Sequence, residues 1–175
     1  MPIPAPNPYD TLPEVPSFTL TSDELTDGGR VPMSAVHDSA EGQNISPSLS
    51  WSGAPEGTQS YVVTCYDPDA PTGCGFWHWI VVGLGADVTS LPAGAGAEDS
   101  GALAGTVTMR NDFGRHAYDG SAPPPGHGDH RYFYAVHALD TADLGLDTSA
   151  SAAFTMFNVV AHTLARAVLV STWSR

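Results

Sequence analysis

The chain has 175 residues, 42% of them hydrophobic, which is enough to bury the core of a single domain. Its formal net charge of −13, from 19 acidic and 6 basic residues, argues against binding to nucleic acid or to anionic membranes. No apolar run reaches the roughly 18 residues of a membrane-spanning helix, so we expect no membrane span. The 18 glycines and 15 prolines favour a protein rich in turns.

The beginning of the chain has a composition of its own. Residues 1–14 are proline-rich, and we expect an extended or loosely attached arm ahead of one domain over residues 15–175. The arm has neither the basic residues nor the apolar segment of a secretory signal, so we expect a cytoplasmic location. Cys65 and Cys74 form no disulfide framework or metal-binding pattern, and Cys65 lies in an apolar segment that predicts a buried free thiol.

Most of the chain predicts β-strands. Residues 17–22 alternate between apolar and polar and predict a short strand, and residues 30–36 predict a short edge strand. Three stronger strands, rich in β-branched and aromatic residues, are predicted at 60–67, 76–84 and 130–139. The strand at 76–84 is apolar on both faces, so we expect it to be central and buried.

The end of the chain has a helical pattern instead. Residues 149–170 place apolar side chains at helical spacing, namely Phe154, Phe157, Ala161, Leu164 and Val168. Strands followed by a helix are typical of a mainly β protein. We therefore predict an antiparallel, Greek-key-like β-sandwich with a C-terminal α-helix packed at its edge.

Several segments occur together in an order that is characteristic of one family. These segments are NISPSLSW, YDPDAPTGCGFWHW, NDFG followed by YDGSAPPPG, HRYFYAVHALD and the late helix. From about residue 16 to the C-terminus the chain resembles the phosphatidylethanolamine-binding protein family, in its bacterial branch of Raf-kinase-inhibitor-like proteins. The resemblance implies a β-sandwich with a small anion-binding pocket at one end, and it also suggests a homodimer.

The resemblance implies which residues border the pocket. They come from the DPDAP loop, the FWHW strand, the Gly/Pro wall and the HRY motif: Asp67, Ala70, Pro71, His78, Gly120, Pro123, His130 and Tyr132. One departure is visible, because the bacterial pattern Gly-Pro-Cys-Pro-Pro is replaced by Gly-Ser-Ala-Pro-Pro from Gly120 onward. Any role of that cysteine is therefore absent here, and the shape of this wall is left open.

Strand geometry gives an expectation for the direction of His78. Every second residue of a strand shares a face. His78 should therefore lie on one face with Phe76 and Ile80, while Trp77 and Trp79 take the other. A histidine near the end of a strand and among aromatic rings can direct one ring nitrogen into a cleft, provided that a partner holds the other nitrogen.

The expected pocket chemistry is that of an oxyanion site. Asp67 is the expected partner of His78, because a carboxylate accepts a hydrogen bond from an imidazole N–H. Prolines and glycines should stiffen the DPDAP loop, with a cis peptide bond between Ala70 and Pro71. His78, His130 and backbone N–H groups could then hold phosphate, carboxylate or a phospholipid headgroup, more tightly near pH 6 than near pH 8.

The sequence gives less specific predictions for four of the other histidines. We expect His137 and His162 to be structural, and His116 and His127 to be solvated or at the rim of the pocket. His127 lies three residues before His130, but such a pair without further ligands is weak evidence for a metal, and we predict none.

We predict structural roles for two aspartates as well. Asp69 is expected to form a turn or to contact an arginine such as Arg131. Asp112, in the NDFG segment, is expected to be a turn or network residue, because no other kinase motif accompanies it.

Two classes of function fit these residues. The first is a binding protein for a small anion or a phospholipid headgroup such as phosphoethanolamine, which could regulate a partner protein, since the family includes inhibitors of kinases and proteases. The alternative is a hydrolase of small esters that uses Asp67, His78 and His130 as acid–base groups. The sequence has no G-x-S-x-G motif, and neither cysteine lies beside a predicted base. We therefore predict a binding protein that is not an enzyme and needs no cofactor.

Overall fold

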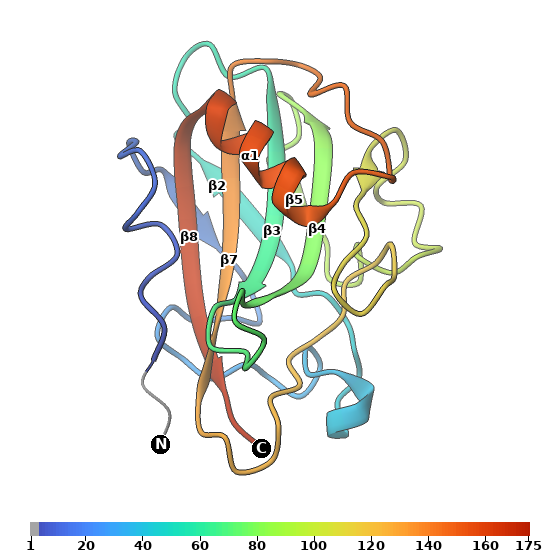
Figure 1. Ribbon diagram of the computed structural model, residues 1–175. Coiled ribbons are helices and arrows are strands. Elements are labelled where there is room, and N and C mark those ends of the chain that lie inside the picture. The colour runs from blue at the N-terminus through green and yellow to red at the C-terminus, as the bar shows by residue number, and fades with distance from the viewer. Residues whose placement is uncertain (1–3) are drawn as a thin grey trace.

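The structure is a computed structural model that describes residues 4–175, and it contains two antiparallel β-sheets (Figure 1). The smaller sheet has three strands in the order β1-β2-β5. Their bounds are Thr19–Thr21 for β1, Leu49–Ser52 for β2 and Ser90–Leu91 for β5. A short 3₁₀ helix, η1, spans Asp38–Ala40 between β1 and β2.

The larger sheet has five strands in the order β6-β4-β3-β7-β8. Their bounds are Val107–Thr108 for β6, Phe76–Gly85 for β4, Ser60–Asp67 for β3, His130–Leu139 for β7 and Thr163–Trp173 for β8. All pairs between neighbouring strands are antiparallel. The three strands that the sequence predicts most strongly are confirmed, and they form the centre of this sheet.

The main hydrophobic core lies between the two sheets. Trp51 and Leu91 of the small sheet belong to the same buried cluster as Val63, Trp79 and Tyr134 of the large sheet. This packing of two antiparallel sheets face to face confirms the predicted β-sandwich.

Helix α1, Ala152–His162, covers the outer face of the large sheet (Figure 1). The side chain of Ser151 caps its N-terminus by accepting a hydrogen bond from the backbone N–H of Phe154. Met156 and Val159 of the helix belong to a second buried cluster that includes Val62 of β3 and Ile80 of β4. The helix therefore lies across the central strands of the sheet, inward of the edge that we expected.

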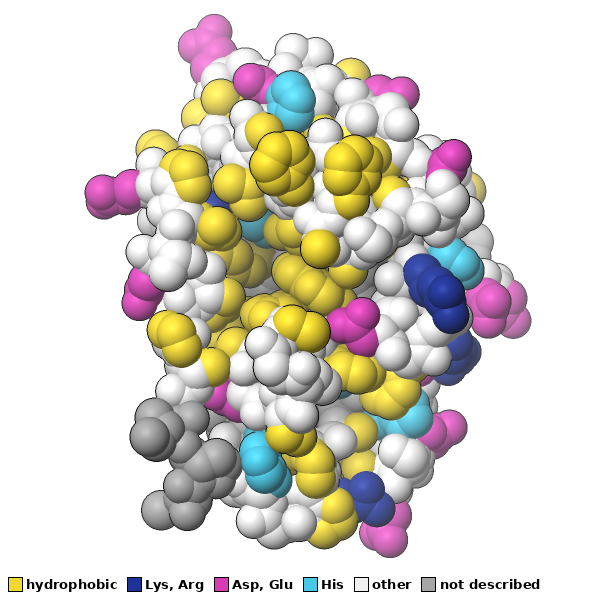
Figure 2. All heavy atoms as spheres, in the orientation of Figure 1, with side chains coloured by type: hydrophobic (Ala, Val, Ile, Leu, Met, Phe, Trp, Pro, Cys, Tyr) yellow, Lys and Arg dark blue, Asp and Glu magenta, His cyan; other side chains and the backbone are white. Residues whose placement is uncertain are grey.

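The predicted helix over residues 149–170 is correct only in its first half. Helix α1 ends at His162, and the chain continues directly into β8. Two of the expected apolar positions face solvent, since Phe154 is 55% exposed and Phe157 is 72% exposed. Figure 2 shows hydrophobic side chains gathered on this face of the molecule, around a hollow below the helix.

Two further segments differ from the expectation. Residues 30–36 form no strand and make only single bridges, from Arg30 to Thr172 and from Val36 to Ser121. The N-terminal arm packs on the large sheet from at least residue 5 onward. Tyr9 is half-buried there, with the guanidinium of Arg166 4.4 Å from the centre of its ring. Across residues 4–175, no helix combines the length and the apolar character needed to cross a membrane.

Candidate functional site

A cavity of about 250 Å³ opens where β3 ends and where β4 and β7 begin. Six of the eight residues that the family resemblance predicts around a pocket line this cavity, namely Asp67, Ala70, Pro71, His78, Pro123 and His130. The other lining residues are Thr72, Phe76, Phe113, Ala122 and Pro124. The structure therefore brings together side chains that are more than 60 residues apart in the sequence, and we call this space the anion cavity after the anion-binding pocket that the family resemblance predicts.

The other two predicted residues lie behind the wall of the cavity. The backbone N–H of Gly120 donates a hydrogen bond to Asn44 Oδ1 at 2.7 Å, and a Cβ atom at Gly120 would collide with the backbone of Ala35. Tyr132 is buried, and its ring packs edge-on against that of His78 with the ring centres 5.3 Å apart. Both residues therefore shape the wall without lining the cavity.

A β-bulge turns His78 toward the cavity. Cys65 of β3 pairs with Trp79, but the next residue, Tyr66, pairs with Trp77, so His78 is an extra residue on β4. Because of the bulge, Trp79 packs between the sheets while Trp77 packs beneath the helix. The expectation that Trp77 and Trp79 share a face is therefore wrong.

The ring of His130 is held by Asp67. The Nδ1–H of His130 donates a hydrogen bond to Asp67 Oδ2 at 2.7 Å, and both side chains are buried. The other oxygen of Asp67 accepts the backbone N–H of Asp69 at 2.8 Å. Asp67 is therefore the partner of His130, and the expectation that it would be the partner of His78 is wrong.

The second nitrogen of His130 has a partner at the rim of the cavity. Its Nε2 lies 2.6 Å from Nδ1 of His127, which agrees with the expected position of His127 at the pocket rim. Asp67, His130 and His127 thus form a continuous chain of hydrogen bonds from the buried end of β3 to the surface.

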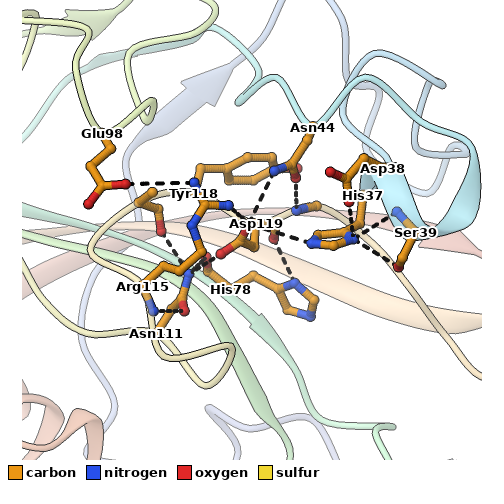
Figure 3. Close-up of polar contacts among 12 residues, drawn as sticks. His37, Asp38, Ser39, Asn44, His78, Glu98, Asn111, Arg115, Tyr118 and Asp119 are labelled. Atoms are coloured by element: carbon orange, nitrogen blue, oxygen red, sulfur yellow. Dashed lines mark hydrogen bonds and ion pairs between the residues drawn. The ribbon is translucent and has the colours of Figure 1, made fainter.

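His78 is oriented by a backbone carbonyl. Its Nδ1–H donates a hydrogen bond to the carbonyl oxygen of Asp119 at 2.7 Å (Figure 3). The carboxylate of Asp119 is buried and accepts hydrogen bonds from Asn44, Asn111 and Arg115, the last at 2.8 Å. This network holds the carbonyl in place and leaves Nε2 of His78 without a protein partner among the described residues.

Sequence reasoning missed Asp119, although it lies next to the predicted Gly120. The contact to His78 uses the backbone oxygen of Asp119, which every residue type has, so the residue type gives no signal for it. The only readable signal is the spacing of Arg115 and Asp119, which are four residues apart and opposite in charge.

The electrostatics of the cavity make His78 neutral at pH 7. Burial lowers the pKa of His78 below its usual value near 6.5, although the nearby negative charge of Asp67 acts in the opposite direction. With its proton on Nδ1, the neutral ring presents the lone pair of Nε2, which accepts hydrogen bonds. An additional proton would turn this atom into a charged donor.

The loop after β3 is anchored by the predicted contact between Asp69 and Arg131, which is an ion pair. Asp69 Oδ2 accepts hydrogen bonds from the backbone N–H and from Nε of Arg131, at 3.0 and 2.8 Å. The other oxygen accepts the backbone N–H of Ala5 at 3.0 Å, so the same carboxylate also holds the N-terminal arm. Burial would raise the pKa of Asp69, but these hydrogen bonds outweigh burial and lower it.

The peptide bond between Ala70 and Pro71 is trans, so the expected cis bond is wrong.

The remaining histidines lie outside the anion cavity. His116 Nδ1 lies 3.0 Å from the carbonyl oxygen of Thr108, and His162 pairs with Asp140 at 2.7 Å. His137 is fully buried under the N-terminal arm. Within residues 4–175 there is no group of three or more His, Cys, Asp or Glu side chains that could hold a metal ion.

Comparison with known proteins identifies the family. A family model described as "Phosphatidylethanolamine-binding protein" matches residues 21–174 of this chain. The chain belongs to the phosphatidylethanolamine-binding protein family. Among the relatives of this chain, YbhB of Escherichia coli (strain K12) is 48% identical over 157 residues, which cover 89% of this chain and 99% of YbhB. YbhB carries the designation UPF0098, which states no ligand or activity.

Solved structures of this family share the fold. The crystal structure of E. coli YbcL matches with a TM-score of 0.88 and 43% sequence identity, covering 91% of this chain and 99% of YbcL. The structure of CT736 from Chlamydia trachomatis, described as a putative homologue of this family, matches with a TM-score of 0.75 and 28% identity, covering 91% of this chain and 98% of CT736. These matches confirm the predicted family and the predicted β-sandwich.

Proposed function

We propose that the anion cavity binds a small oxyanion: phosphate, a carboxylate, or the phosphate of a phospholipid headgroup such as phosphoethanolamine. The observation that carries this proposal is the convergence of His78 and His130 on one small cavity, each with its Nδ1–H held by a separate fixed acceptor. The ring of each histidine is thereby oriented with its Nε2 on the side away from that acceptor. Protonated imidazoles are strong hydrogen-bond donors to phosphate and carboxylate oxygens.

Binding of an anion at this site should be coupled to uptake of a proton. The chain has a net charge of −13, and Asp67 adds a carboxylate at the cavity itself, so an anion needs local positive charge. Burial lowers the pKa of His78, so the free protein lacks the charge on this ring at pH 7. The anion stabilises the protonated ring, and its affinity should therefore rise as the pH falls.

Hydrolysis of small esters is supported less well. Thr72 is the only hydroxyl or thiol residue that lines the cavity, and its hydroxyl donates to the carbonyl oxygen of Gly75. Cys65 is buried in the core, where burial raises the pKa of its thiol, and Cys74 does not line the cavity. A nucleophile beside a base, which this chemistry normally uses, is therefore lacking among the described residues. We therefore propose a binding protein. Three further points stay predictions, namely regulation of a partner protein, a homodimer and a cytoplasmic location.

Calorimetric titration with inorganic phosphate tests the proposal. The wild-type protein should bind phosphate more tightly at pH 6 than at pH 8. His78→Ala and His130→Ala should each weaken binding at pH 6 by about tenfold or more, as expected for loss of a charged hydrogen bond. His162→Ala is the matched control, because this histidine is exposed and lies outside the cavity. Equal affinities at both pH values and in all three variants would refute the proposed site, and turnover of phosphate esters that depends on His78 would favour the hydrolase.

A further inference from the structure

A second and larger hollow, of about 420 Å³, lies on the outer face of the large sheet. We call it the apolar groove and define it by Pro8, Tyr9, Tyr66, Trp77, Met156 and Phe157. Tyr66 of β3 and Trp77 of β4 come from the sheet, the N-terminal arm forms one wall and helix α1 forms the other. Figure 2 shows this hollow, lined by hydrophobic side chains below the helix.

The lining of the groove favours hydrocarbon. None of the residues that line it is charged, and two tyrosine hydroxyls and the indole N–H of Trp77 are the only polar side-chain groups among them. The hydroxyl of Tyr66 already donates a hydrogen bond to the carbonyl oxygen of Cys74 at 2.8 Å. The volume lies within the range of about 300–1,000 Å³ that is typical of small-molecule sites. An occupant of this groove must therefore be mainly apolar and no larger than a small molecule.

The apolar groove and the anion cavity have a common neighbour on the surface. A third hollow, of about 450 Å³, follows the loop between β3 and β4. It shares Ala70 with the anion cavity, and it shares Pro8 and Tyr66 with the apolar groove. The three hollows therefore lie side by side around the end of β3, with the histidines and Asp67 at one end and hydrocarbon side chains at the other.

This order of polarity matches a molecule that has a phosphate at one end and a hydrocarbon chain at the other. We propose that the apolar groove binds the single hydrocarbon chain of a phosphate amphiphile, such as a monoacyl phospholipid, whose phosphate occupies the anion cavity. The inference rests on the proposed function for the phosphate end only. A single extracted amphiphile also fits the net charge of −13, which opposes contact with an anionic bilayer.

Two exposed aromatic residues of α1 provide a matched pair of variants. Phe157 lines the groove, whereas Phe154, one turn earlier, does not. Both side chains are more than half exposed, so Phe157→Glu and Phe154→Glu should both fold. The two variants add the same charge to the same helix, and only the first puts that charge into the groove.

The experiment compares inorganic phosphate with monododecyl phosphate, below its micellar concentration, by calorimetry at pH 6. Wild type and Phe154→Glu should bind monododecyl phosphate at least tenfold more tightly than phosphate. Phe157→Glu should lose this gain and keep the wild-type affinity for phosphate. Monododecyl phosphate should also change the fluorescence of the wild-type protein more than phosphate does, because Trp77 lines the groove.

The outcomes separate this inference from the proposed function. If phosphate binds through His78 but the dodecyl chain adds no affinity, the groove proposal is overturned and the anion site stands. The groove proposal is also overturned if both glutamate variants lose the gain equally, because the effect is then one of general charge. If phosphate fails to bind and monododecyl phosphate binding is unaffected by His78→Ala, the proposed function fails, and the shared ligand fails with it.

Discussion

Two hydrogen bonds converge on the ring of His130, and together they use both of its nitrogens. Asp67 accepts from Nδ1, and His127 lies within hydrogen-bonding distance of Nε2. His78 differs, because only its Nδ1 is engaged by the protein in the described part of the chain. At the scale of single residues, one histidine is thus free to meet an anion, while the other must first exchange its contact with His127.

We therefore expect His127 to compete with the anion. His127→Ala should tighten phosphate binding at pH 7.5 by about two- to tenfold, because a net hydrogen bond of about 0.5–1.5 kcal/mol no longer has to be broken. His127→Asn is the conservative variant, since its amide N–H can replace the Nδ1–H of histidine and should keep affinity near the wild-type value. Calorimetry with phosphate measures both, and weaker binding by His127→Ala would instead make His127 a ligand of the anion.

At the scale of elements, side-chain pattern predicts the central strands well and fails where a pattern fits two structures. Residues 163–170 satisfy helical spacing, but Ala165, Ala167 and Leu169 also alternate, and in the structure they are buried along β8. Pairing with β7 decides between the two, because β8 supplies hydrogen-bond partners along its whole length. Pairing of this kind is not visible in the local sequence.

The candidate site shows the same division between features that the residue pattern predicts and features that depend on strand pairing. The sequence and its family resemblance supply Asp67, His78 and His130 as pocket residues, but not how they are connected. Asp67 meets His130 because β3 and β7 are neighbours, with Tyr66 opposite Phe133. The partner of His78 depends on a β-bulge and on a backbone carbonyl, and residue types reveal neither.

The loop between β3 and β4 offers a prediction at this scale, because Asp69 joins the loop, β7 and the N-terminal arm. Asp69→Ala should lower the free energy of unfolding by about 1–2 kcal/mol, since several hydrogen bonds to a charged group are lost from a partly exposed site. Asp129→Ala is the control, because its pair with Arg30 is more than half exposed on both sides and should contribute less than about 0.5 kcal/mol. Urea unfolding at pH 7 measures both, and equal losses would show that Asp69 does not anchor these elements.

At the scale of the whole molecule, the N-terminal arm and the outer face of the large sheet enclose a histidine without a partner. His137 is fully buried beside the ring of Tyr9, and neither of its ring nitrogens has a hydrogen-bond partner among the described residues. Burial, and to a smaller extent the positive charge of Arg166, lower the pKa of His137 to about 3. The folded protein therefore resists protonation at a position where the unfolded chain accepts a proton near pH 6.5.

This difference predicts how the stability of the whole protein depends on pH. Because the folded-state pKa of His137 lies below the unfolded value, its contribution to stability is complete above pH 6.5 and is lost as the pH falls from 6.5 toward 3. Between pH 7.5 and pH 5, protonation of His137 in the unfolded chain should lower the free energy of unfolding by about 2 kcal/mol. The variant His137→Leu removes the titrating ring without breaking a hydrogen bond. Between pH 7.5 and pH 5 it should therefore lose about 2 kcal/mol less of its free energy of unfolding than the wild-type protein.

Urea unfolding of both proteins at pH 5, 7.5 and 8.5 provides the measurement. The difference between their free energies of unfolding should be constant from pH 7.5 to 8.5 and should change only at pH 5. Parallel losses at pH 5 would mean that His137 is protonated in the folded protein, and that the arm opens to let water reach it.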